Sequence, residues 1–179
     1  AVTTASNLTA VGTGALTANT SGSSNVATGY NSLDANTTGS SNTGLGQNAL
    51  GSNTTASNNT AVGNASLGAN TTGTQNTAVG ASALDAATTA NYNTALGAFA
   101  ATDTTGNNNT AVGRIALYVN TSGSGNTAIG TETLRNNTTA SDNTGVGYAA
   151  LSQNTTGTLN SAVGKGAGQL LTTGNDNTF

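Results

Sequence analysis

The chain lacks most of the residues on which enzymes and metal proteins depend. It contains no Cys, His, Pro, Met or Trp, and its 179 residues include only three basic and six acidic side chains. Without His and Cys, a Ser-His-Asp triad, a thiolate site and a typical zinc site are all excluded. So few basic residues disfavour nucleic acid as a partner. No apolar run reaches the length of a membrane span, and no polybasic or amphipathic segment suggests a membrane surface.

A 17-residue unit, N-T-A-V-G-x-x-A-L followed by x-x-N-T-T-G-S-x, repeats along the chain. A fixed period of this length is typical of a repeat architecture, in which each unit buries its apolar face only by stacking on its neighbours. The repeat glycines keep this period throughout, except that the step from Gly97 to Gly113 is one residue shorter. The glycines are Gly12, Gly29, Gly46, Gly63, Gly80, Gly97, Gly113, Gly130, Gly147 and Gly164.

The residues before each glycine predict a short β-strand. Thr and a branched apolar residue lie on one face of this segment and Ala on the other, whereas Gly, Asn and Thr disfavour a helix. We expect Val62 and Val79, with Leu67 and Leu84, to form two apolar rows inside the coil. The residue before the glycine is Val, Leu or Ile in nine repeats, with Thr28 as the exception. Leu occurs four residues after the glycine in eight repeats, and Ala101 and Gly168 break that row.

Stacked coils place equivalent residues above one another, about 4.8 Å apart. We expect one row of Asn to bond amide to amide along the axis, as ladders do. This row is Asn25, Asn42, Asn59, Asn76, Asn93, Asn109, Asn126, Asn143, Asn160 and Asn177. A Thr row without exception accompanies it: Thr20, Thr37, Thr54, Thr71, Thr88, Thr104, Thr121, Thr138, Thr155 and Thr172.

One repeat is a residue short, between Gly97 and Gly113. Loops tolerate changes of length better than ladders, so we expect the turn to absorb the deletion without a shift of strand register. In that repeat Ala101 replaces the usual Leu, and Phe99 is expected to fill the vacated volume.

The charged residues form no evident site. The acids are Asp34, Asp85, Asp103, Glu132, Asp142 and Asp176. Asp34 and Asp85 share a row but lie three coils apart, about 14 Å, so general acid–base catalysis is disfavoured. Arg114, Arg135 and Lys165 are too sparse in sequence to predict an anion site. The segment Gly164-Lys165-Gly166-Ala167-Gly168 lacks the G-K-[ST] ending of a phosphate loop and is interpreted as a degenerate coil. We therefore predict no catalytic, cofactor-binding or metal-binding residue.

Two surface functions remain as alternatives. The N-x-[ST] sequons, which are glycan acceptors in some hosts, are here interpreted as turn and ladder chemistry. They include Asn7, Asn19, Asn36, Asn53, Asn58, Asn70, Asn108, Asn120, Asn136, Asn137 and Asn154. An uncharged solenoid with Thr rows is also typical of ice-binding proteins. That function requires two outward Thr rows on one face, whereas the paired Thr residues of each repeat are adjacent and would point to opposite faces of a strand.

Each coil holds only about two large aliphatic side chains, which is little for a lone rod. We therefore expect a second chain to cover the Ala rows, because small residues let backbones approach closely. The rows are Ala61, Ala78, Ala95, Ala111 and Ala128, and Ala49, Ala83, Ala116 and Ala150.

The motifs N-T-A-V-G-x-x-A-L and N-T-T-G resemble repeats of bacterial and phage-type fibre proteins. They are also similar to the head repeats of trimeric autotransporter adhesins, which use a related A-I-G motif and a shorter unit. The resemblance covers the whole chain and implies a left-handed parallel β-roll wound by three chains into a fibre for surface attachment. It carries over no binding residue, because the matching positions are structural.

The sequence thus predicts one all-β domain over residues 1–179, a parallel β-solenoid in which each coil is one 17-residue repeat. We expect a non-enzymatic, extracellular, homotrimeric fibre or adhesin segment without cofactors, with an ice-binding or glycan-binding solenoid as the alternative. The chain begins at Ala1 without a signal peptide and ends inside a repeat, so we also expect it to be part of a longer fibre whose segments stack end to end.

Overall fold

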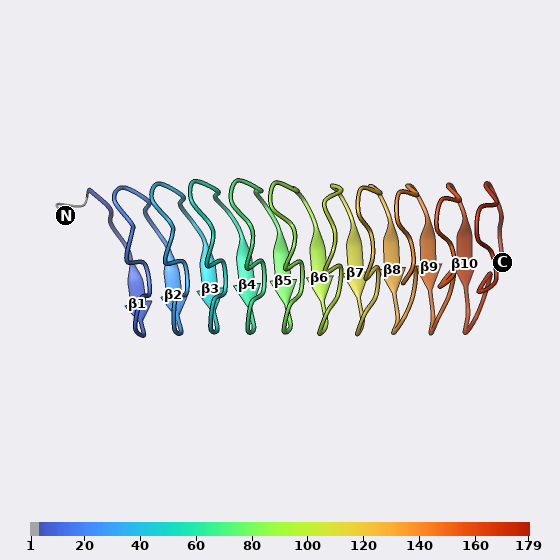
Figure 1. Ribbon diagram of the computed structural model, residues 1–179, viewed down its shortest axis with the longest axis horizontal. Helices are drawn as coiled ribbons and strands as arrows, with labels where there is room; N and C mark the ends of the chain where they lie inside the picture. Colours follow the sequence, from blue (N-terminus) through green and yellow to red (C-terminus); the bar gives the residue numbers. More distant parts are fainter. Residues whose placement is uncertain (1–3) are drawn as a thin grey trace.

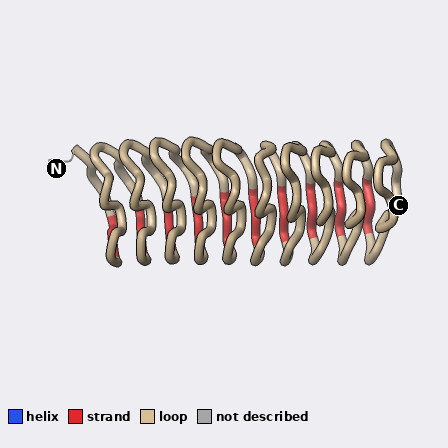
Figure 2. Tube along the Cα trace, viewed as in Figure 1, coloured by secondary structure: helices blue, strands red, loops and turns tan. Residues whose placement is uncertain are grey.

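The computed structural model describes residues 4–179, and Ala1 with its two neighbours lies outside the described part. The chain winds as a row of similar coils into a rod, with the two ends of the chain at opposite ends (Figure 1). Each full coil contributes one strand of three residues, and turns make up most of the rest (Figure 2). The strands are β1 (Thr9–Val11), β2 (Val26–Thr28), β3 (Thr43–Leu45), β4 (Thr60–Val62), β5 (Thr77–Val79), β6 (Thr94–Leu96), β7 (Thr110–Val112), β8 (Thr127–Ile129), β9 (Thr144–Val146) and β10 (Ser161–Val163).

The ten strands form one parallel sheet in chain order, so the predicted all-β solenoid with one coil per repeat is confirmed. Thr77 pairs with Thr94, and the same 17-residue step joins the other neighbours except β6 and β7. Backbone hydrogen bonds also connect successive coils outside the strands, as from Leu67 N–H to Ala83 O at 2.9 Å. The axial ladder therefore runs through the turns as well as the sheet.

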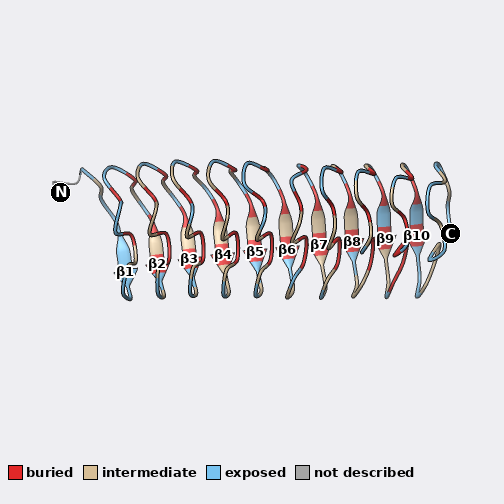
Figure 3. Ribbon diagram, in the orientation of Figure 1, coloured by how far each residue is buried: buried red, intermediate tan, exposed pale blue. Residues whose placement is uncertain are grey.

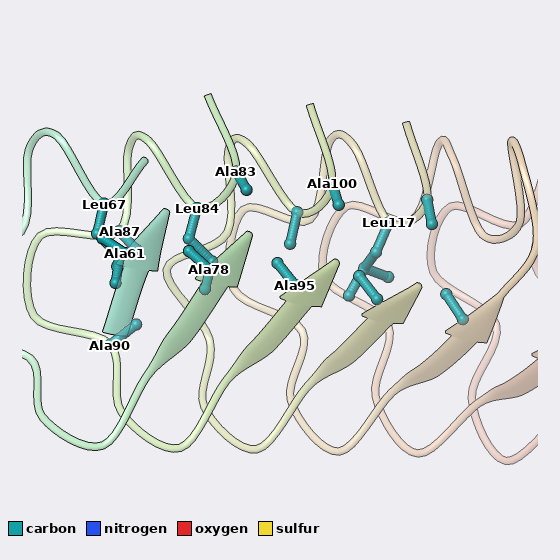
Figure 4. Packing of buried hydrophobic residues seen from close by; sticks show 14 of the residues in the cluster. Ala61, Leu67, Ala78, Ala83, Leu84, Ala87, Ala90, Ala95, Ala100 and Leu117 are labelled. Atoms are coloured by element: carbon teal, nitrogen blue, oxygen red, sulfur yellow. The ribbon is translucent and has the colours of Figure 1, made fainter. Parts of the chain in front are cut away.

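The coil interior is built from Leu and Ala (Figure 4). Leu67 and Leu84 are fully buried, as predicted, whereas the prediction that Val62 and Val79 lie inside is wrong. Val62 is half-buried, and Val79 keeps 38% of its surface exposed. In β2 to β10 the middle residue is buried instead, and Ala78 has no exposed surface. Figure 3 shows how burial varies along each coil.

The width of the coil decides which face of the strand turns inward. Every strand has Ala or Gly at its middle position. At Gly44, a Cβ atom would lie 2.6 Å from Ser32 Oγ and 3.4 Å from Leu33 Cγ, so the leucine row packs directly against the strand backbone. A Val side chain has no room there. Alternation along the strand then sends Thr and Val together to the outside.

The same packing overturns the expected role of the Ala rows. Ala78 and Ala111 in the strands, and Ala83 and Ala116 beside the leucines, have no exposed surface within this single chain. They complete the interior of the coil and cannot contact a second chain. The first contact surface predicted for an oligomer is therefore wrong.

Two buried Asn rows connect successive coils by hydrogen bonds along the axis. In the predicted row, the backbone N–H of Asn76 donates to Asn59 Oδ1 at 2.9 Å, and Asn76 Nδ2 donates to the same oxygen at 3.3 Å. A second row, in the turns, continues this chemistry: Asn53 Nδ2 donates to Asn36 Oδ1 at 2.9 Å. The second row comprises Asn19, Asn36, Asn53, Asn70, Asn120, Asn137 and Asn154.

The second Asn row is interrupted, and the interruption leaves polar atoms without partners. Ala87 and Thr104 occupy the two positions between Asn70 and Asn120. Asn70 Oδ1 and Thr104 Oγ1 are consequently buried without a hydrogen bond. Asn154 Oδ1 is unpartnered for the same reason, because the next coil places Leu171 at this position.

The short repeat keeps its register, as predicted. Thr94 pairs with Thr110, and Asn93 Nδ2 donates to Gly106 O at 3.0 Å, so the residue is lost within the turn. Two details differ from expectation. Thr105, not Thr104, takes the place of the Thr row, where its hydroxyl donates to the carbonyl of Thr121. Phe99 does not fill the space beside Ala101, because it lies at the outer corner with 42% of its surface exposed.

Candidate functional surfaces

The outer surface of the sheet carries two parallel rows of side chains, which we call the sheet face. The first residue of each strand supplies a hydroxyl row: Thr9, Thr43, Thr60, Thr77, Thr94, Thr110, Thr127, Thr144 and Ser161, with Val26 as the exception. The third residue supplies an apolar row: Val11, Leu45, Val62, Val79, Leu96, Val112, Ile129, Val146 and Val163, with Thr28 as the exception. No charged side chain belongs to either row, so the whole face is neutral.

The hydroxyls of the sheet face are available to a ligand or to solvent, unlike those of the first Thr in each turn pair. In the turns, Thr37 Oγ1 donates to Thr54 O at 3.0 Å, and Thr54 Oγ1 donates to Thr71 O at 3.1 Å. Within residues 4–179, no side-chain hydrogen bond engages the hydroxyl of Thr60, Thr77 or Thr94. The row that contains Thr37 and Thr54 is therefore structural, whereas the sheet row lies on the outer surface of the strands, and the second Thr of a turn pair, such as Thr55, is also exposed.

A shallow groove, with a volume of about 630 Å³, runs along one corner of the rod. It exists because Gly51 and Gly68 replace larger residues between Asp34 and Asp85 in the same row. Asp34 and Asp85 thus lie at its two ends, as their shared row predicted. Burial raises the pKa of the Asp85 carboxyl, and the charge of Asp103 in the next coil raises it further. This coupling between Asp85 and Asp103 was missed, because they occupy adjacent positions in successive coils rather than one row.

A second pocket, of about 290 Å³, gathers two of the three basic residues of the chain. Arg114 and Arg135 line it together with Phe99, Ile115 and Tyr118, and we call it the arginine pocket. The two arginines thus line one pocket although they are sparse in the sequence, and whether an anion binds there stays a prediction. Arg114 follows its repeat glycine by one residue, and Arg135 follows the next repeat glycine by five. Only the path of the coil shows that these two positions in successive coils lie near each other.

The other candidates from the sequence are structural. Seven of the twelve sequon asparagines form the second buried Asn row, so folding removes them from reach of a glycosylating enzyme. Asn7, Asn58, Asn64 and Asn108 are exposed, and Asn136 is half-buried. The segment Gly164–Gly168 forms a turn of the last coil, where Lys165 Nζ lies 5.9 Å from the centre of the Tyr148 ring.

Residues 4–179 contain no group of three or more acidic side chains able to hold a metal ion. The same described range has no helix long and apolar enough to cross a membrane. Comparison of the chain with protein-family models, with curated proteins and with solved structures found no match. The resemblance to fibre and adhesin repeats therefore stays a prediction.

Proposed function

We propose that this protein is a non-enzymatic structural rod, a segment of an extracellular fibre or adhesin. The axial ladder is the observation that supports the proposal most strongly. Backbone hydrogen bonds of the strands and turns, and the two Asn rows, all connect successive coils along the rod. Most residues of the repeat therefore contribute to stiffness along the axis. The residues of each row serve the coil rather than a catalytic centre.

The proposed rod is a left-handed homotrimer, as the resemblance implies, but its chains meet through the sheet face. An exposed apolar row along the whole sheet is the kind of surface that marks a protein–protein contact. Val79, Leu96 and Ile129 each keep close to 40% of their surface exposed. The neighbouring hydroxyl row supplies hydrogen-bonding groups that remain unsatisfied by the chain itself.

Light scattering coupled to size exclusion tests this assembly. We expect the chain of 17.1 kDa to elute with three times that mass. Val79→Asp and Ile129→Asp place an unpaired charge in the proposed contact and should yield folded monomers, since a buried lone charge is strongly unfavourable. Thr72→Asp, in an exposed turn, is the matched control and should remain trimeric. A wild-type protein that elutes with the mass of one chain refutes self-association.

Ice binding is a second candidate, favoured by one observation. The sheet face is neutral and regular, and it combines free hydroxyls with apolar groups at a repeat of about 4.8 Å along the rod. The predicted obstacle, paired Thr residues on opposite faces, concerns the turns and not this face. A monomeric chain with thermal hysteresis that Thr94→Lys abolishes, and Thr88→Lys in the turn leaves intact, would favour this function over the fibre.

A further inference from the structure

We propose that the arginine pocket binds a single sugar ring that carries a carboxylate. The pocket lies at the corner of the coil, outside the two rows of the sheet face, so the inference does not depend on how the rod assembles. Phe99 and Ile115 each follow the repeat glycine by two residues, in successive coils, and Tyr118 and Arg135 each follow it by five. Two rows of the solenoid thus form its two walls, each row advancing about 4.8 Å per coil.

The composition of these two walls is unlike that of any other part of the corner. The positions equivalent to Phe99 and Ile115 hold Asn31, Asn48 and Ala65 in earlier coils. The positions equivalent to Tyr118 and Arg135 hold Gly51 and Gly68. Large apolar and cationic side chains therefore replace small and polar ones over three neighbouring coils, although neither the strand nor the ladder requires them.

The cations of the pocket have no side-chain partner in the part of the chain that the structure describes. Between residues 4 and 179, no ion pair or side-chain hydrogen bond engages Arg114 or Arg135. Their hydrogen bonds to other residues are through the backbone, where Glu132 N–H donates to Arg114 O at 3.2 Å and Val119 N–H donates to Arg135 O at 3.1 Å. The guanidinium groups are thus available to an external acceptor.

The chemistry of the lining selects the ligand class. A guanidinium group binds a carboxylate with two parallel hydrogen bonds, which fixes its orientation. Phe99, Ile115 and Tyr118 contribute apolar surface that a bare inorganic anion would leave uncovered, whereas the carbon face of a pyranose ring can pack on it. The volume of about 290 Å³ is at the lower end of small-molecule sites, which matches one ring rather than a chain of rings.

The surrounding charges favour one negative charge over two. Glu132 follows Ile115 in its row, and Asp103 N–H donates to Tyr118 O at 3.1 Å, so two carboxylates belong to the residues next to the pocket. Together they offset the two arginines. A ligand with one negative charge can bind the guanidinium groups with little repulsion from these two carboxylates. A dianion such as phosphate is repelled by them more strongly. Nucleic acid is disfavoured because only three basic residues occur in the whole chain.

Saturation-transfer NMR with glucuronate as the probe tests the proposal. We expect glucuronate to bind wild type and glucose at the same concentration to show no detectable binding. Inorganic phosphate at an equal concentration should displace little of the bound glucuronate. Arg114→Gln and Arg135→Gln should each lower the affinity at least about tenfold, because each removes one or more hydrogen bonds between charged groups. Lys165→Gln removes the third cation and is the matched control, with no change expected.

Three results would overturn the proposal: no transfer from the protein to glucuronate, equal binding by the Arg114→Gln variant, or phosphate competing as well as glucuronate. The last result would mean a simple anion site in which the apolar wall plays no part. A Tyr118→Ser variant separates these contributions. It should weaken glucuronate but leave phosphate unchanged, and circular dichroism confirms that each variant is folded.

Discussion

The corner glycines offer the sharpest test of the fold, through substitution of Gly80 by Ala. Gly80 has a φ of +134°, a conformation that residues with a Cβ rarely adopt. Its Cβ would also lie 2.5 Å from both the carbonyl carbon and the carbonyl oxygen of Gly97 in the next coil. These are backbone atoms of the ladder, so no side-chain rotation relieves the contact.

The magnitude follows from two terms. The unfavourable conformation costs about 1–3 kcal/mol. Moving the two coils apart also weakens the axial bonds beside the corner, from Gly97 N–H to Val79 O at 2.7 Å and from Phe99 N–H to Ala81 O at 2.9 Å. Each contributes about 1 kcal/mol net. We therefore expect Gly80→Ala to lower the free energy of unfolding by about 3–5 kcal/mol, or the melting temperature by about 10 °C.

Two control variants separate the terms. Gly164 has the same φ of +134°, but its Cβ would meet only Ala167 Cβ at 3.9 Å, so Gly164→Ala should show the conformational term alone. Gly68→Ala lies along the rod at ordinary φ, and its Cβ would meet the end of the Asp85 side chain at 2.6 Å, which can rotate away, and Ala65 O at 3.2 Å. It should melt near wild type. If urea and thermal unfolding place Gly80→Ala level with Gly68→Ala, the packing of corner glycine on corner glycine is wrong.

Three further outcomes are expected. Ala87→Asn restores a member of the second Asn row and gives hydrogen-bond partners to Asn70 Oδ1 and Thr104 Oγ1. It should raise the free energy of unfolding by about 2 kcal/mol in urea titrations. The control Ala86→Asn, at an exposed position, should leave that free energy unchanged. Ala101→Leu completes the leucine row and should add about 1 kcal/mol by the same assay; a loss of stability would mean that the coil has already closed around the alanine. Burial, then repulsion from Asp103, raises the pKa of Asp85, so the carboxyl binds its proton more tightly when folded, and its contribution to stability falls as pH rises through its ordinary range to the raised value. Asp85→Asn should abolish that part of the decline in a series of melts from pH 3 to pH 7, and an unchanged slope would contradict the assigned burial.

Sequence alone was sufficient for the period, the class of fold and the axial register. Because Gly, Leu and Asn recur every 17 residues, the sequence predicts coils that stack in parallel with equivalent residues aligned. The same period gives the number of residues in one coil. The leucine row and the first Asn row were also identified correctly, because their spacing has no competing interpretation. Even the deletion before Gly113 was placed correctly, since a ladder tolerates a shorter turn but not a shifted strand.

Sequence did not decide which face of the strand lies inside. The alternation in Thr-Ala-Val separates Ala from Val, but hydrophobicity alone assigns the interior to Val79, and that assignment is wrong. The strict limit to Ala or Gly at the middle position was the available signal, since only a crowded interior excludes every larger residue.

The tertiary structure decided this point and the sites that depend on it. Leu84 enters the coil from a left-handed turn with a φ of +52°, which brings the leucine row against the strand backbone and leaves room only for Ala. The Val side chains therefore lie on the outer sheet face, and the Ala rows are buried where a second chain cannot contact them. The path of the chain also decides that Arg114 and Arg135 line one pocket. A 17-residue period places equivalent residues in rows, but only the path of the chain around the corner determines which rows are neighbours.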